Sequence, residues 1–148
     1  MSANPEVRDY MAMKVVTADA SDSVYDAATK MIETKVGCIV VTQNDDIAGV
    51  VTKGDIIRNT VLRLQDPKLV RVSTIMSTPV VTVSPDYSLE QAAKLMSDRH
   101  VSKLPVVDDE SGLLVGIITA SDIINVEPGY IEYLKELITS STRKKEEL

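Results

Sequence analysis

Two similar stretches of sequence decide the fold of this chain. Residues 11–43 read MAMKVVTADASDSVYDAATKMIETKVGCIVVTQ, and residues 76–108 read MSTPVVTVSPDYSLEQAAKLMSDRHVSKLPVVD. At a spacing of 65 residues the identical pairs include Val15/Val80, Val16/Val81, Thr17/Thr82, Ser23/Ser88, Ala27/Ala92 and Met31/Met96. After a two-residue insertion near 110–112 the spacing becomes 67, and the matching pairs are Gly49/Gly116, Thr52/Thr119, Asp55/Asp122, Ile56/Ile123 and Ile57/Ile124. Self-similarity at a fixed spacing predicts two copies of one structural unit.

Each copy begins with a predicted strand and a predicted helix. Short β-branched runs at 15–17 and 80–83 lead into polar turns, and helices are expected to open at Ser23 and Ser88. The sequence SLEQ at Ser88 fits a capping box, because Gln91 follows the serine by three residues. Apolar side chains at helical spacing mark the buried face of the second copy's helix: Leu89, Ala92, Ala93 and Met96.

Two further strands and a second helix complete each copy. The strands are predicted at 38–42 with 47–51, and at 104–107 with 113–118, joined by the polar turns QNDD and DDESG. The second helices are expected to start at Thr52 and Thr119, with the isoleucines at 56, 57, 123 and 124 facing inward.

The predicted fold class is α+β, with two tandem β-α-β-β-α repeats packed sheet to sheet under pseudo-two-fold symmetry. We expect this pairing because a copy of about 50 residues is too small to close a core alone. Repeat 1 is assigned to residues 10–64, the linker to 65–73, and repeat 2 to 74–127. A C-terminal helix and tail are assigned to 128–148, with helically spaced apolar residues at Ile131, Leu134, Leu137 and Ile138.

The composition excludes several classes of function. A net charge of −6 and the lack of Phe and Trp argue against nucleic-acid binding, which uses clustered basic residues and aromatic platforms. One cysteine and one histidine argue against a metal site. No run of about 20 apolar residues is present to span a membrane, and the first ten residues do not resemble a signal peptide, so a cytoplasmic protein is expected.

The repeats resemble the CBS domain family, whose members occur as tandem pairs called Bateman modules. The resemblance covers roughly residues 10–126, and its strongest marks are VSKLPVVD (101–108), GIITASDII (116–124) and GVVTKGDII (49–57). Each motif alone is weak, but two full copies at fixed spacing are specific.

The resemblance implies an adenosine ligand in the cleft between the repeats. By that resemblance, Asp55 and Asp122 hold ribose hydroxyls, and Thr52 and Thr119 reach the phosphate or sugar. Lys103 takes the place of a basic phosphate contact. The backbone and apolar side chains that would grip the adenine are Val16, Thr17, Ile39, Val40, Val81, Thr82, Leu104 and Pro105.

A structural alternative exists for each T-x-x-D motif, since Thr and Asp at these positions also form a helix cap. The two roles are compatible, because one carboxylate oxygen can cap the helix while the other binds a sugar. The copies also differ, because Cys38 stands in repeat 1 where Lys103 stands in repeat 2. This difference puts equal occupancy of two sites in doubt.

The expected function is a stand-alone regulatory module that binds AMP, ADP, ATP or S-adenosylmethionine and signals to an unidentified effector protein. The alternative is a structural dimerisation module without ligand. We expect a homodimer, with Leu62, Leu64 and the C-terminal apolar residues on its interface. No catalytic residues, metal or further cofactor are expected, because the sequence has no nucleophile–base constellation or phosphate loop. Cys38 is interpreted as a small buried hydrophobe and His100 as a surface or cleft-edge residue.

Overall fold

The computed structural model describes residues 5–126 and 129, which form two compact units. One unit consists of residues 15–80 and contains repeat 1. The other combines residues 5–14 with residues 81–126 and 129 and contains repeat 2. The chain therefore divides differently in space than along the sequence, because the segment before residue 15 packs with the second repeat.

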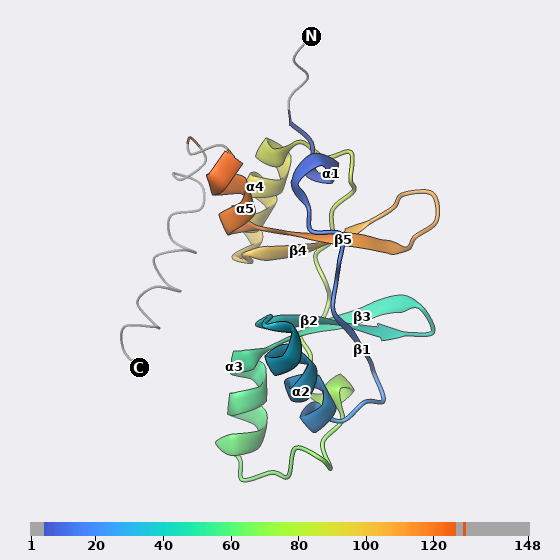
Figure 1. Cartoon of the computed structure of the whole chain (residues 1–148), viewed down its shortest axis with the longest axis vertical. Coiled ribbons are helices and arrows are strands. Elements are labelled where there is room, and N and C mark those ends of the chain that lie inside the picture. The colour runs from blue at the N-terminus through green and yellow to red at the C-terminus, as the bar shows by residue number, and fades with distance from the viewer. Residues whose placement is uncertain (1–4, 127–128, 130–148) are drawn as a thin grey trace. The chain divides into compact units, whose positions relative to one another are not determined.

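The unit of residues 15–80 is a three-stranded sheet with helices on one face (Figure 1). Strand β1 pairs in parallel with β2, and β2 pairs antiparallel with β3. The turn between β2 and β3 places Asn44 and Asp45 at positive φ, the conformation that a tight hairpin requires. The elements are β1 (Thr17–Asp19), α2 (Val24–Thr34), β2 (Cys38–Gln43), β3 (Asp46–Thr52), α3 (Lys53–Ile56), the π-helical turn η1 (Ile57–Val61) and the 3₁₀ turn η2 (Val72–Thr74).

The unit containing repeat 2 is an antiparallel hairpin covered by helices (Figure 1). Its short N-terminal helix packs here because Ala12 and Ile117 exchange backbone hydrogen bonds, each 2.9 Å from N to O. The elements are α1 (Val7–Tyr10), α4 (Leu89–Arg99), β4 (Lys103–Val107), β5 (Leu114–Thr119) and α5 (Ala120–Val126). The C-terminal helix expected at 128–148 lies outside the described residues apart from residue 129.

Each unit has its own apolar core, and a segment from outside the repeat contributes to it, so neither repeat closes its core alone. The missing surface comes from segments outside the repeats: Val72 completes the core of repeat 1, and Val7 completes that of repeat 2. The expected buried face of α4 is confirmed, because Leu89, Ala92, Ala93 and Met96 are fully buried.

Local helix starts follow the predicted capping chemistry. Ser23 and Ser88 are the N-caps of α2 and α4, and each side chain accepts a hydrogen bond from the third helical residue. Gln91 completes the predicted capping box, since its Oε1 accepts from the Ser88 N–H at 2.9 Å. The caps therefore fix where both long helices begin.

Three local predictions were wrong. Residues 80–83 form no strand, and only Val83 bridges Val106, since the run is flanked by Pro79 and Pro85, which lack N–H donors. The first strand of repeat 1 lies at Thr17–Asp19, two residues later than expected. Ile57 is half exposed, because α3 changes to the π-helical turn at this residue.

Candidate functional site

The T-x-x-D motif of repeat 1 joins a strand to a helix. Strand β3 ends at Thr52, and α3 begins at the next residue. The Asp55 N–H donates to Oγ1 of Thr52 at 3.2 Å, and the Thr52 N–H donates to Oδ2 of Asp55 at 2.9 Å. These reciprocal bonds form a capping box, which satisfies two backbone donors at the start of the helix.

The motif of repeat 2 has the same geometry. The Asp122 N–H donates to Oγ1 of Thr119 at 3.1 Å, and the Thr119 N–H donates to Oδ2 of Asp122 at 3.0 Å. The structural alternative from the sequence is therefore real in both repeats. Since the cap uses only one carboxylate oxygen, it leaves the other for a different role.

That second oxygen distinguishes the two aspartates. Oδ1 of Asp55 accepts a hydrogen bond from Nη2 of Arg58 at 2.9 Å. Within residues 5–126 and 129, Oδ1 of Asp122 accepts no hydrogen bond. Asp55 is buried and Asp122 is half-buried. Only the carboxylate of repeat 2 keeps an open acceptor in this part of the chain.

Lys103 lies beside the motif of repeat 2. It pairs with Thr119 across β4 and β5, and directly opposed residues of an antiparallel pair point to the same face of the sheet. Its side chain is exposed. Cys38 occupies the same register position opposite Thr52 in repeat 1 and is partly buried. The structure thus places an ammonium group next to one motif and a thiol next to the other.

The candidate adenine contacts lie on neighbouring chain segments within each unit. In repeat 1, Thr17 pairs with Val40, and the Val40 N–H donates to the carbonyl of Val16 at 3.2 Å. In repeat 2, the segment containing Val81 and Thr82 leads into Val83, whose N–H donates to the carbonyl of Pro105 at 3.0 Å.

Two of the candidate adenine contacts have fully buried side chains. Ile39 belongs to the core of repeat 1 and Leu104 to the core of repeat 2, and neither is exposed. Their side chains fill the core, so only their backbone groups remain for a ligand. Val40 and Pro105, the next residues along each strand, are also buried and lie outside both core clusters.

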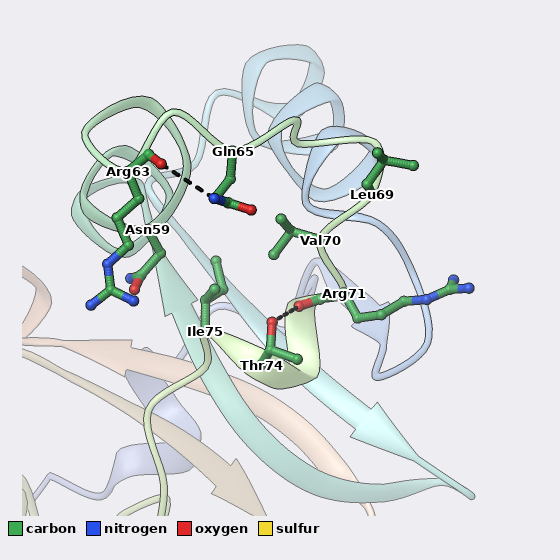
Figure 2. A pocket seen from close by; sticks show the side chains of 8 residues that line it. All are labelled: Asn59, Arg63, Gln65, Leu69, Val70, Arg71, Thr74 and Ile75. Carbon is green, nitrogen blue, oxygen red and sulfur yellow. Dashed lines mark hydrogen bonds between the residues drawn. The ribbon is translucent and has the colours of Figure 1, made fainter.

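A pocket of about 400 Å³ lies in the unit of repeat 1, and neither Thr52 nor Asp55 lines it. Figure 2 shows Val70 and Ile75 facing it and the side chain of Arg71 extending away from it. Arg71 is engaged elsewhere, because its Nη1 donates to the carbonyl of Ser21 at 2.5 Å. None of the residues predicted as ligand contacts lines this pocket.

A second pocket, of about 300 Å³, includes one predicted ligand contact, Thr82. It is also lined by Ser84, whose hydroxyl donates to Oδ2 of Asp109 at 2.6 Å, and by Asp108. Backbone and side-chain hydrogen bonds from Ser111 lower the pKa of the Asp108 carboxyl. The acidic side chains make this pocket a poor match for a phosphate group.

The histidine has a structural role at the end of a helix. His100 is exposed and forms the left-handed C-cap of α4, as its φ of 54° shows. Among the described residues there is no group of three acidic, histidine or cysteine side chains arranged to hold a metal ion. The same residues include no helix with the length and hydropathy required to cross a membrane.

Two residues beside the motif of repeat 1, Arg58 and Gly54, were not predicted from the sequence to take part in the site. Their counterparts in repeat 2, at the spacing of 67 residues, are Asn125 and Ser121. The two repeats differ at both positions, and this difference was the signal in the sequence. It was overlooked because the repeats were aligned on their identical residues.

Comparisons with known proteins identify the family of the chain. The model of the CBS domain matches residues 7–61 and 72–129. An uncharacterized protein of Methanopyrus kandleri is 37% identical over 123 residues, which are 82% of this chain and 62% of that protein. This chain therefore spans less than two thirds of that relative's length.

Two solved structures are similar over most of the chain. The CBS domain pair of protein MJ0100, in complex with 5′-methylthioadenosine and S-adenosyl-L-methionine, has a TM-score of 0.73 and 27% identity, covering 86% of this chain and 98% of that one. A hexameric CBS-CP12 protein from bloom-forming cyanobacteria has a TM-score of 0.74 and 28% identity, covering 97% and 86%. Because the CBS domain model matches both repeats and the similar solved structures are CBS proteins, the chain belongs to the CBS domain family.

Proposed function

We propose that this CBS domain pair is a regulatory module that binds a ligand containing adenosine. The candidate ligands are AMP, ADP, ATP and S-adenosylmethionine, and the bound state signals to a partner protein. The observation that carries the proposal is the junction of Thr119 and Asp122, where one carboxylate oxygen caps α5 and the other accepts no bond within the described residues.

The chemistry of this junction suits a nucleoside. A carboxylate oxygen accepts hydrogen bonds from ribose hydroxyls, as acidic residues do in dinucleotide-binding folds. The exposed ammonium group of Lys103 lies across the strand pair from Thr119, where it can attract a phosphate or another anionic group. The similarity to a CBS pair in complex with two adenosine derivatives supports the same class of ligand.

The test separates ligand binding from helix capping at Asp122. Asp122→Asn keeps the size of the side chain and some capping ability but removes the charge. Hydrogen bonds to charged groups contribute about 1.5–3 kcal/mol, so affinity is expected to fall at least about tenfold. Isothermal titration with AMP and S-adenosylmethionine measures this loss, and the melting temperature without ligand is expected to stay close to wild type.

A role as a cap alone gives the opposite pattern. Loss of a charge at a helix N-terminus costs about 0.3–1 kcal/mol of stability and leaves the ligand affinity of the folded protein intact. Normal affinity with a lowered melting temperature would therefore remove Asp122 from the binding site.

A structural module without ligand is the second candidate function. It is favoured by the reciprocal capping bonds, which give Thr52, Asp55, Thr119 and Asp122 a structural purpose in the absence of any ligand. A thermal-shift screen distinguishes the two functions, because a ligand at a hundred times its Kd stabilises the folded state by about 2.7 kcal/mol. A screen of all four ligands without stabilisation would favour the structural module.

We also propose that two copies of the chain associate in either case. The unit of repeat 1 exposes a run of large apolar side chains on and after its second helix: Ile57, Val61, Leu62, Leu64 and Leu69. Exposed apolar surface of this kind is typical of protein–protein contacts. Leu62 and Leu64 are the residues expected from the sequence to contribute to a homodimer.

A further inference from the structure

The two T-x-x-D aspartates differ in how their second carboxylate oxygen is used. Oδ1 of Asp55 is 2.9 Å from Nη2 of Arg58, one turn further along the helix. The Asp55 side chain is 13% exposed and the Arg58 side chain 62%, so the guanidinium group covers the carboxylate from the solvent side. Both oxygens of Asp55 are therefore occupied, one by the Thr52 N–H and one by Arg58.

Gly54 makes room for this arrangement. A Cβ atom on Gly54 would lie 2.9 Å from Nη1 of Arg58, closer than real Cβ contacts allow. Gly54 lies inside α3, where glycine is less favourable than any residue except proline. The absence of a side chain at this position lets the guanidinium group lie across the start of the helix.

The second repeat lacks both parts of this arrangement. Ser121 stands where Gly54 would be, and Asn125 stands where Arg58 would be. A shorter, neutral side chain at position 125 cannot form the ion pair that Arg58 makes. The two T-x-x-D motifs therefore match in their Thr and Asp residues but differ at these two nearby positions.

We propose that Arg58 determines which of the two motifs binds ribose, by occupying the carboxylate of Asp55. A sugar hydroxyl has to displace the guanidinium group from Oδ1 of Asp55 or share that oxygen with it, whereas no residue in the described part of the chain bonds Oδ1 of Asp122. At low ligand concentration Asp122 binds first. This inference rests on the proposed adenosine-binding function and names the residue that makes its two half-sites unequal.

The experiment uses the full chain and 5′-methylthioadenosine, an uncharged probe, so that the charge of Arg58 does not act through a phosphate. Asp122→Asn isolates the Asp55 half-site, and its Kd is measured by isothermal titration with and without Arg58→Asn. Because the Arg58 side chain is 62% exposed and its ion pair is screened by solvent, removing this side chain is expected to tighten binding by about two- to fivefold. Arg63→Asn is the matched control, since Arg63 is an exposed arginine of the same segment and is expected to change nothing.

The reverse exchange tests the same idea on the other repeat. Asp55→Asn isolates the Asp122 half-site, and Ser121→Gly with Asn125→Arg transfers the arrangement to it. Binding is expected to weaken by a similar factor of about two to five. Circular dichroism melting of each variant verifies that it is folded.

The outcomes separate the two proposals. Binding at Asp122 together with an unchanged Kd at Asp55 after Arg58→Asn would overturn the role of Arg58 and leave the proposed function standing. No binding of the probe or of any of the four candidate ligands to the wild-type chain would overturn both.

Discussion

Gly116→Ala is expected to destabilise the unit of repeat 2, because the backbone of this glycine in β5 packs closely against Met11 and Ala12 of the N-terminal segment. A Cβ atom at this position would be 2.7 Å from Sδ of Met11 and 2.9 Å from the carbonyl oxygen of Ala12. The thioether side chain can rotate away, but the carbonyl belongs to the backbone. It accepts a 2.9 Å hydrogen bond from the Ile117 N–H, so moving it weakens that bond.

The magnitude follows from these contacts. Overpacking by one methyl group costs about 1–3 kcal/mol, and a weakened backbone hydrogen bond adds about 0.5–1.5 kcal/mol. We therefore expect Gly116→Ala to lower the free energy of unfolding by about 2–4 kcal/mol. Gly49, its counterpart in repeat 1, is the matched control: among the nearest atoms, its added Cβ would meet only the side chain of Met76, at 2.6–2.9 Å.

Urea unfolding monitored by circular dichroism measures both variants. Met76→Ala is expected to restore part of the stability lost in Gly49→Ala, because it removes Sδ and Cγ of Met76 but leaves its Cβ, which would lie 2.9 Å from the added atom. Met11→Ala is expected to restore only part of the loss in Gly116→Ala, since the carbonyl of Ala12 remains. An unfolding free energy of Gly116→Ala within about 0.5 kcal/mol of wild type would refute the reasoning, as would full rescue by Met11→Ala.

Three further predictions concern the ligand, the acidic turn and association. Lys103→Ala is expected to weaken the binding of AMP several-fold, about 1 kcal/mol, and the binding of adenosine by less. If isothermal titration shows the same loss of affinity for both ligands, Lys103 does not contact the phosphate. Ser111→Ala removes the side-chain hydrogen bond that helps to lower the pKa of Asp108, so carboxyl NMR titration should show that pKa rising toward its ordinary value. Because a lowered pKa favours the folded state above the ordinary value, this contribution fades as the pH falls through the folded-state pKa, and a titration unchanged by the mutation would contradict the assignment. Leu62→Ser with Leu64→Ser is expected to shift the dimer toward monomer in light scattering, and a wild-type chain of only 16.1 kDa at micromolar concentration would exclude the dimer.

Local sequence signals predicted the repeat architecture well. The caps at Ser23 and Ser88 and both hairpins appear where the pattern put them, because each depends on residues close together in the chain. The T-x-x-D motifs were likewise expected at helix starts. The strand expected at 80–83 failed, since β-branched residues favour a strand only where neighbouring donors are available to pair.

The packing between distant segments was not predictable in the same way. Val7 and Val72 complete the two cores from outside the repeats, and nothing in their local sequence indicates which core each one joins. The ion pair between Arg58 and Asp55 was missed because it depends on the space left by Gly54. Such features are set by contacts across space, whereas periodicity and capping report on a few neighbouring residues.

One unit is inserted into the sequence of the other, and this order has a consequence for folding during translation. Residues 15–80 form one contiguous unit, so this part of the chain is complete as soon as residue 80 has emerged. The segment with Val7 and Ala12 emerges first, yet its partner Ile117 is translated about a hundred residues later. Domains fold as units during translation. Repeat 1 is thus expected to fold before repeat 2 has been translated. Until then, the apolar side chains of the segment before residue 15 remain exposed to solvent.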